Sequence, residues 1–249
     1  MKLPFTSASN TDERAEISRA WYLWLPIAFF VTRYAVAVIT DKYHGVESWF
    51  LGELGIVENL TVFLLLLAML TTINLLWRFG ASLGLLPRLF LALYSLGCLY
   101  FLGEEASWGQ HWFGWETNEY FRAINDQQET NFHNTHKLLD RIPKGVVSLG
   151  IFLGGIVVPL YLRRKRLAID VSRAYWWLFP TFACLPTAIF ASVATWPSKI
   201  EKHTGVNFYF DQAQETKELY IAYFFLLFAL SLWLRLRQMR DAGQAYSPR

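Results

Sequence analysis

Two adjacent carboxylates, Glu104 and Glu105, directly follow a long apolar run. A carboxylate at the end of a membrane helix is costly unless it reaches water, a cation or a partner, so acids at that depth are functional candidates. Carboxylates also act as general acids or bases, and we therefore take both residues as candidate catalytic groups. If the helix continues beyond them, Trp108, His111 and Trp115 share a face with Glu104.

A second group of chemically capable residues follows in the same polar segment. His133, His136 and Asp140 come four, seven and eleven residues after Glu129, which places all four on one face of a helix. Carboxylate and imidazole groups four residues apart can share a divalent cation such as zinc or ferrous iron. The spacing is neither His-Glu-x-x-His nor Glu-x-x-His. It predicts either a metal site of Glu129, His133 and His136 on a helix that ends at Pro143, or a solvated helix face.

Acids also lie near the ends of other apolar runs, at the same expected depth. Glu58 begins the second run, while Glu215 and Glu218 precede the sixth. We expect Glu58 and Glu215 to converge with Glu104, Glu105, Glu129 and His133 on one polar pocket. Arg33 lies inside the first run, and a buried arginine needs a carboxylate partner. The further candidates for this pocket are Glu58, Gln110, His111, Glu215, Glu218 and Arg33.

Six apolar runs must position these residues. A spanning helix needs about 20 mostly apolar residues. The chain of 249 residues is 54% hydrophobic and only 17% charged, whereas soluble domains carry roughly 25% charged residues. The sequence therefore predicts an all-α polytopic membrane helix bundle that forms one integral membrane domain, residues 1–249. The predicted spans are 21–40, 56–77, 86–103, 146–162, 174–196 and 219–234, with a large outer loop at 104–144.

Basic residues predict the direction of insertion, because loops rich in Lys and Arg stay cytoplasmic. They gather at residues 163–166 and in the tail after the sixth run. Their alternation places both termini in the cytoplasm and all five histidines on the outer face. Cys98 and Cys184 lie inside apolar runs without a partner at short spacing. They therefore predict neither a disulfide nor a thiolate metal site.

Two segments of the long loop carry a resemblance to a known group of proteins. The residues Glu104-Glu105-x-Ser107-Trp108-Gly109-Gln110 and Glu129-Thr130-Asn131-x-His133-Asn134 resemble those of uncharacterised bacterial multipass inner-membrane proteins. No activity, cofactor or partner follows from this resemblance. It implies a bacterial inner (cytoplasmic) membrane, a periplasmic outer face, and a single site formed by the two segments.

Three classes of function fit these observations. The first is a metal-dependent membrane enzyme whose periplasm-facing acids and histidines act on a lipid-like substrate. The second is a non-catalytic subunit or assembly factor, and the third is a cation or proton transporter. A transporter requires polar residues through the bilayer, and Arg33 is the charged residue that lies well inside a run. The partners expected are the lipid bilayer and a membrane-protein complex or homo-oligomer; the chain lacks the basic tract typical of nucleic-acid binding.

Overall fold

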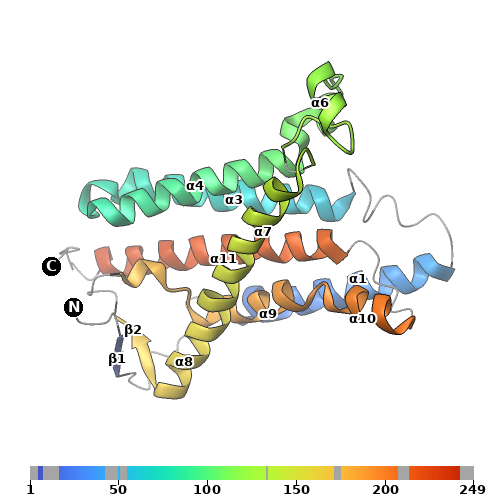
Figure 1. Ribbon diagram of the computed structural model, residues 1–249. Helices are drawn as coiled ribbons and strands as arrows, with labels where there is room; N and C mark the ends of the chain where they lie inside the picture. Colours follow the sequence, from blue (N-terminus) through green and yellow to red (C-terminus); the bar gives the residue numbers. More distant parts are fainter. Residues whose placement is uncertain are drawn as a thin grey trace.

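Six helices long and apolar enough to cross a membrane make up the fold, which confirms the predicted all-α polytopic bundle. The computed structural model describes residues 5–7, 17–42, 50, 55–132, 134–170, 175–206 and 213–241. Figure 1 shows α3, α4, α9 and α11 running alongside one another, while α7 crosses them at an angle. The six candidate spans are Ala20–Ile39, Ile56–Ser82, Leu85–Glu105, Leu138–Lys165, Trp176–Thr204 and Ala213–Asp241.

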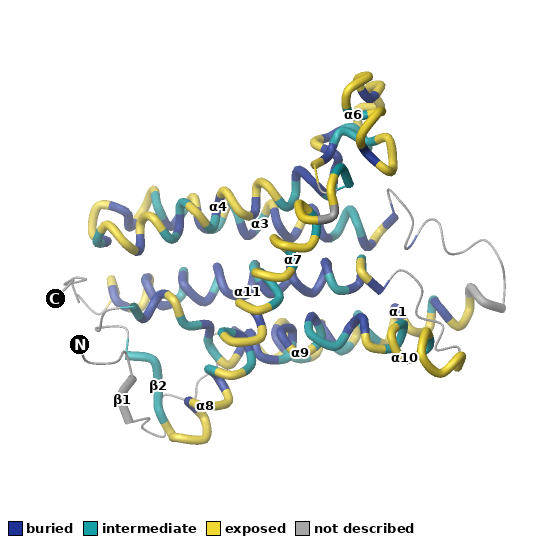
Figure 2. Tube along the Cα trace, viewed as in Figure 1, coloured by how far each residue is buried: buried dark blue, intermediate teal, exposed yellow. Residues whose placement is uncertain are grey.

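Helix α11 (Ala213–Asp241) is the central helix of the bundle. It packs against α3 (Ile56–Phe79) and α9 (Leu185–Val193), and α3 in turn packs against α4 (Leu85–Glu105). In its most apolar stretch, 78% of the residues are buried inside the protein, compared with 17% in the most apolar stretch of the first span, Ala20–Ile39. Figure 2 shows the same contrast, with α11 mostly buried and α4 alternating between buried and exposed residues. Lipid contact therefore falls mainly on the outer helices.

Two π-helical segments precede prolines inside the spans. Segment η1 (Ala20–Trp24) ends two residues before Pro26, and η4 (Ile151–Val157) ends two residues before Pro159. Proline has no N–H, and its ring crowds the carbonyl four residues earlier. A wider turn relieves that clash and lets displaced backbone groups find partners, which a bilayer demands.

The fifth span is interrupted near its start by short 3-10 turns, η5 (Trp176–Leu178) and η6 (Phe182–Cys184), around Pro180. Non-helical backbone is tolerated at membrane depth only where protein covers it. Arg235 of α11, 2% exposed, supplies part of this cover by donating from Nη1 to the Trp176 carbonyl at 3.0 Å. Its guanidinium also lies 5.3 Å from the Trp176 ring. The arginine thus adds a second hydrogen bond to the Trp176 carbonyl, which also accepts from the N–H of Phe179 at 3.3 Å.

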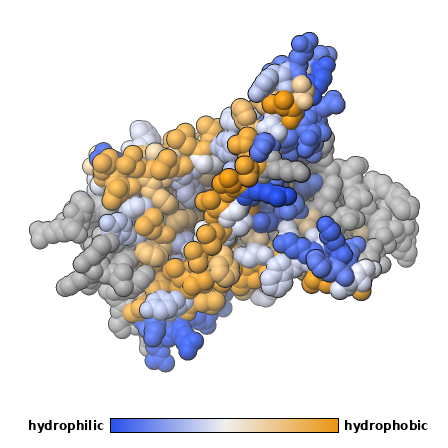
Figure 3. All heavy atoms as spheres, in the orientation of Figure 1, coloured by the Kyte–Doolittle hydropathy of each residue, from blue (hydrophilic) through white to orange (hydrophobic). Residues whose placement is uncertain are grey.

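The fourth span begins earlier than predicted. It consists of α7 (Lys137–Gly150), η4 and α8 (Val158–Lys165), and Pro143 lies inside α7. The prediction that the helix ends at Pro143 is therefore wrong. Helix α7 is strongly amphipathic, since it exposes Leu138, Leu139, Ile142, Val146 and Leu149 while Lys144 is part-buried. Figure 3 shows these apolar side chains as a ridge across one face of the molecule.

The two ends of the bundle carry different structural elements. At one end, strand β1 (Phe5–Ser7) pairs antiparallel with β2 (Leu167–Ile169), beside the end of α8 and near the end of α11. At the other end lie residues 106–132 and 134–136, with α5 (Gln110–Phe113) and α6 (Glu119–Ile124). We call this second end the loop end. It also holds α10 (Trp196–Thr204) and the end of α1 (Leu25–Lys42).

Close packing at Gly155 provides a test of the bundle. A Cβ at this position would lie 2.6 Å from Ala188 Cβ and 2.6 Å from Phe224 Cε2, whereas nothing lies within 4 Å of a Cβ at Gly150. We expect Gly155→Val to lower the free energy of unfolding by about 1–3 kcal/mol through overpacking. Gly150→Val introduces the same side chain into the same span and should change stability far less. Thermal unfolding in detergent measures both, and equal losses would contradict the packing.

Candidate functional site

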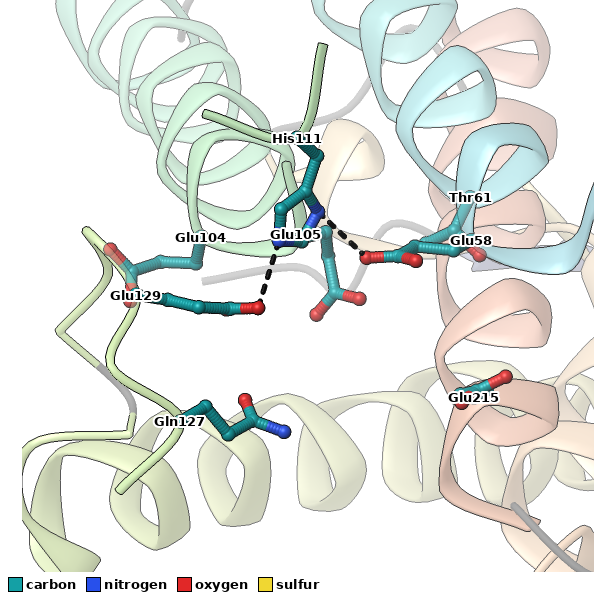
Figure 4. Close-up of a pocket in the computed structure, with 8 residues that line it drawn as sticks. All are labelled: Glu58, Thr61, Glu104, Glu105, His111, Gln127, Glu129 and Glu215. Carbon is teal, nitrogen blue, oxygen red and sulfur yellow. Dashed lines mark hydrogen bonds and ion pairs between the residues drawn. The ribbon is translucent and has the colours of Figure 1, made fainter. Parts of the chain in front are cut away.

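A polar pocket of about 130 Å³ lies at the loop end of the bundle. Figure 4 shows its lining side chains approaching one another from α3, α4, α5, α11 and the loop before α7. Five of the candidate acids, from α3, α4, α11 and the loop, line this one pocket, whereas Glu218 does not and His133 lies outside the described residues. The lining residues are Glu58, Thr61, Glu104, Glu105, His111, Gln127, Glu129 and Glu215.

The chain turns back sharply at the end of α4. Helix α4 ends at Glu105, and Ser107, Trp108 and Gly109 take positive φ values of 44°, 56° and 103°. This backbone breaks the helix, so the expectation that Glu104, Trp108, His111 and Trp115 share one helix face is wrong. Glycine adopts φ of 103° without steric cost. The reversal instead turns α5, and with it His111, back towards α3.

The carboxylate of Glu104 fastens the loop to α4. Its Oε1 accepts from Trp108 Nε1 at 2.8 Å, and its Oε2 accepts from the backbone N–H of Phe132 at 2.8 Å. The residue is only 3% exposed. The Trp108 ring fits because Gly103 has no side chain; a Cβ there would lie 2.9 Å from the ring. Of the two candidate catalytic acids, Glu104 is therefore engaged as a structural acceptor.

Glu129 is held by donors from both sides of the loop. Its Oε2 accepts from Ser107 Oγ at 2.7 Å and from Asn131 Nδ2 at 2.7 Å, while its Oε1 meets His111 Nε2 at 3.0 Å. Ser107 and Asn131 are 0% and 1% exposed. Because charge-assisted hydrogen bonds are short and strong, these contacts fix the direction of the Glu129 carboxylate.

Turns held by asparagine side chains stand where the sequence predicted a helix from Glu129 to Asp140. The Asn125 amide donates to Asn131 O and Oδ1 at 3.0 and 2.8 Å, and its Oδ1 accepts from the N–H of Gln127 and Glu129 at 2.9 and 3.1 Å. Such local bonds compete with helix formation. Residues 125–132 and 134–136 form no helix, and α7 starts only at Lys137. The predicted shared helix face of Glu129, His133, His136 and Asp140 is therefore wrong.

Gln110 crosslinks the loop rather than lining the pocket. Its Nε2 donates to Thr117 Oγ1 at 2.7 Å, and its Oε1 accepts from the N–H of Thr130 at 2.8 Å. Thr117 in turn donates to the Gln128 carbonyl at 2.6 Å. Sequence reasoning missed Ser107, Thr117, Asn125 and Asn131. Asn and Ser near Gly or Asp are turn formers that hydrogen-bond nearby backbone, so the signal was present in the residue types.

His111 bridges two elements that are far apart in the sequence. Its Nδ1 lies 3.2 Å from Glu58 Oε1 on α3, and its Nε2 lies 3.0 Å from Glu129 Oε1 in the loop. The hydrogen bonds to Glu129 and Glu58 raise the pKa of His111 to about 10, against the opposing effect of burial. The neighbouring Trp112 also donates from Nε1 to Asn59 Oδ1 at 3.0 Å. At neutral pH an imidazolium therefore joins α3 to the loop.

Glu105 differs from its neighbours in the pocket. It is part-buried, and no described residue donates a hydrogen bond to its carboxylate. In Figure 4 its carboxylate points into the space between Glu129 and Glu58. Both oxygens of Glu105 therefore face the pocket without a hydrogen bond from the described residues.

The other predicted site residues lie around the pocket. Glu218 is ion-paired to Lys144 of α7 at 2.9 Å, and Lys144 also meets Asp140 at 2.7 Å. Arg33 is fully buried in α1 and donates from Nε to Thr216 Oγ1 at 3.2 Å, next to Glu215 in the chain. These contacts tie α7 and α1 to α11 near the pocket.

His136 lies away from the pocket. It is exposed and caps α7, since its Nδ1 accepts from the N–H of Leu138 at 3.2 Å. In the part of the chain that the structure describes, no three His, Cys, Asp or Glu side chains are already arranged to hold a metal ion. Comparisons of the chain with protein-family models, curated proteins and solved structures found no match. The function must therefore be argued from the site itself.

The His111 bridge predicts how stability depends on pH. Because the folded-state pKa of about 10 exceeds the ordinary value of 6.5, the bridge stabilises fully below pH 6.5 and is lost as the pH rises through 10. We expect the stability difference between the wild type and His111→Gln to shrink over this range. Unfolding of both proteins in detergent at pH 6.5, 8 and 10 measures this difference. Groups that titrate in both proteins contribute equally and cancel in the comparison. A constant difference would contradict the bridge.

The adjacent acids Glu104 and Glu105 form a matched pair for mutation. Glu104→Gln places an NH₂ group opposite either Trp108 Nε1 or the Phe132 N–H, so one buried donor loses its acceptor. We expect a loss of about 1–3 kcal/mol in unfolding free energy. Glu105→Gln removes no hydrogen bond and should leave stability unchanged or raised. Thermal melting of both variants tests the assignment, which a larger loss at Glu105 would refute.

Proposed function

We propose that this protein is a membrane enzyme whose loop end faces the periplasm, with a cation-dependent site in which Glu105 is the general base. The observation that carries the proposal is the Glu105 carboxylate, which receives no hydrogen bond from the described residues and points into a pocket with four other acids. General bases are recognised by a free proton-accepting atom within reach of a bound substrate. The pocket offers that atom and space beside it.

The choice of Glu105 rests on what the other acids already bind. Glu58 and Glu129 share the His111 imidazole, and Glu104 accepts from Trp108 and from the backbone. A carboxylate used in this way is a poor proton acceptor, because its lone pairs are committed and its charge is stabilised. Glu105 retains both oxygens for chemistry, which supports its role as base.

Cation binding follows from the charge of the pocket. Five carboxylates line it, and His111 is the basic group among its lining residues. Carboxylate oxygens suit hard cations such as Mg²⁺, Ca²⁺ or Mn²⁺, whereas zinc and iron prefer sites richer in nitrogen or sulfur. The volume of about 130 Å³ exceeds the roughly 10–15 Å³ that one water needs. A partly hydrated cation fits this space better than zinc held by the predicted histidines.

The depth of the pocket indicates an amphipathic substrate. Glu105 is the last residue of α4, and Glu58 and Glu215 lie in the first turns of α3 and α11. Groups at the ends of spanning helices lie at the level of the lipid headgroups. A lipid-like molecule can present its headgroup there while its chains stay in the bilayer. Glu105 would accept a proton from the attacking water or hydroxyl, and the cation would offset the charge that develops.

The packing below the pocket favours a one-sided site over a transport path. Val57, Leu65 and Leu75 of α3 are 0% exposed, and Leu227 and Leu232 of α11 are 1% exposed. These side chains belong to one hydrophobic core cluster. The buried polar groups of α3 at this depth, Thr61 and Thr72, donate to the backbone of their own helix. Proton and ion paths need polar groups or water at that depth. We therefore place the enzyme ahead of the transporter.

Cation binding by purified protein tests the proposal. We expect the wild type to bind Mn²⁺ and Glu105→Gln to bind it at least tenfold more weakly, because the pocket around the cation loses one negative charge. Glu116→Gln removes a charge from a side chain that is 95% exposed, outside the pocket, and should bind as the wild type does. Titration followed by electron paramagnetic resonance measures all three.

Two results would overturn the proposal. One is the absence of Mn²⁺ binding in the wild type, and the other is equal affinity in Glu105→Gln. Mass spectrometry of protein purified without chelators separates hard cations from zinc or iron. Stoichiometric zinc that is lost in His133→Ala would restore the metal site predicted from Glu129, His133 and His136.

A further inference from the structure

Large aromatic side chains are exposed in the polar segment at the loop end. We call residues 106–132 and 134–136 the loop module. Within it, Trp112 is 52% exposed, Phe113 77% and Tyr120 69%. Trp115, at 41%, stacks on Phe113 with ring centroids 5.9 Å apart. Exposed apolar groups gathered in one segment indicate a contact surface.

The module lies beside the spanning helices. Figure 1 shows it projecting sideways from the end of α4, across the direction in which α3, α4 and α11 run. The chain enters the module from a span that ends at Glu105 and leaves it into a span that begins at Leu138. Both connections hold the base of the module at the level where spans leave the bilayer.

Lipid-facing surface continues into the module from both sides. Helix α4 exposes Leu93, Leu96 and Leu99, and α7 exposes Ile142 and Val146. On the face seen in Figure 3, apolar side chains cover α4 and α7 up to the base of the module, whereas its tip is mostly hydrophilic. The apolar, lipid-facing surface of the spans therefore reaches the base of the module.

We propose that the loop module is seated in the outer leaflet, with Trp112, Phe113 and Tyr120 in the headgroup–acyl boundary of the phospholipids. Trp and Tyr prefer that depth because their rings are apolar and their N–H or O–H groups reach water or polar partners. The seating stands on position and exposure and is independent of the proposed catalysis, while its assignment to the outer leaflet rests on the proposed orientation, in which the loop end faces the periplasm.

This seating would place lipid directly at the rim of the pocket. The short helix α5 carries His111 into the pocket and Trp112 and Phe113 to its outside. Trp112 is fixed to α3 through Asn59. The lipid boundary and the pocket are thus separated by one helical turn, so headgroups of the outer leaflet lie next to the polar site.

Spin labels at single cysteines measure the depth directly. The native Cys98 and Cys184 are buried, so an added surface cysteine is the preferred target for labelling. Phe113→Cys and Tyr120→Cys are labelled in phospholipid vesicles, and collisions with oxygen and with a water-soluble nickel chelate are compared. Glu116→Cys, from a side chain that is 95% exposed, serves as the aqueous control within the same module.

We expect the ratio of oxygen to nickel accessibility at positions 113 and 120 to exceed that at 116 by severalfold. Equal ratios at all three positions would show that the aromatic side chains stand in water and would overturn the proposal. High ratios at 113 alone would limit the buried surface to α5 and contradict the seating of Tyr120. None of these outcomes depends on cation binding, so failure here is distinct from failure of the proposed site.

Discussion

The structure depends on satisfying carboxylates where the helices leave the bilayer. Glu104 is almost completely buried at the end of α4, and an unpaired charge there would cost several kcal/mol. The loop supplies the missing donors, from Trp108 and the backbone to Glu104 and from Ser107 and Asn131 to Glu129. Its irregular path is the one that brings those donors to the two acids. The pocket is the space that this arrangement leaves between the loop, α3 and α11.

The same constraint acts within the bilayer, on backbone groups instead of charges. Pro26 and Pro159 each follow a π-helical segment that re-pairs displaced carbonyls. The broken start of the fifth span is satisfied by Arg235 from α11, and at the loop end Arg33 of α1 also donates to α11. Each buried arginine thus fixes a neighbouring segment to the central helix. Helix α11 can therefore carry the buried Arg235 and also accept a hydrogen bond from Arg33 of α1, although protein surrounds it.

Hydropathy and charge predicted the fold, because a spanning helix is a local property of about 20 residues. The depth of Glu58, Glu105 and Glu215 was predictable for the same reason, and depth alone brought them to one level. The prediction of a helix from Glu129 to Asp140 was wrong because it followed the helical spacing of these residues, whereas Asn125 and Asp126 just before them are turn formers. His111 was a candidate for the pocket, but its bridge was not predictable, since its partner Glu58 lies 53 residues earlier and no local pattern reveals such a contact.

The charge balance around the pocket supports the role proposed for Glu105. His111 is shared between Glu58 and Glu129, and Lys144 is shared between Asp140 and Glu218. Each of these cations therefore serves two carboxylates, which leaves an excess of negative charge beside an apolar bundle. A carboxylate in that setting either takes up a proton or attracts a cation from solution. Both states suit a group that exchanges protons with a substrate, because folding has engaged the neighbouring acids and left Glu105 to respond to what enters the pocket.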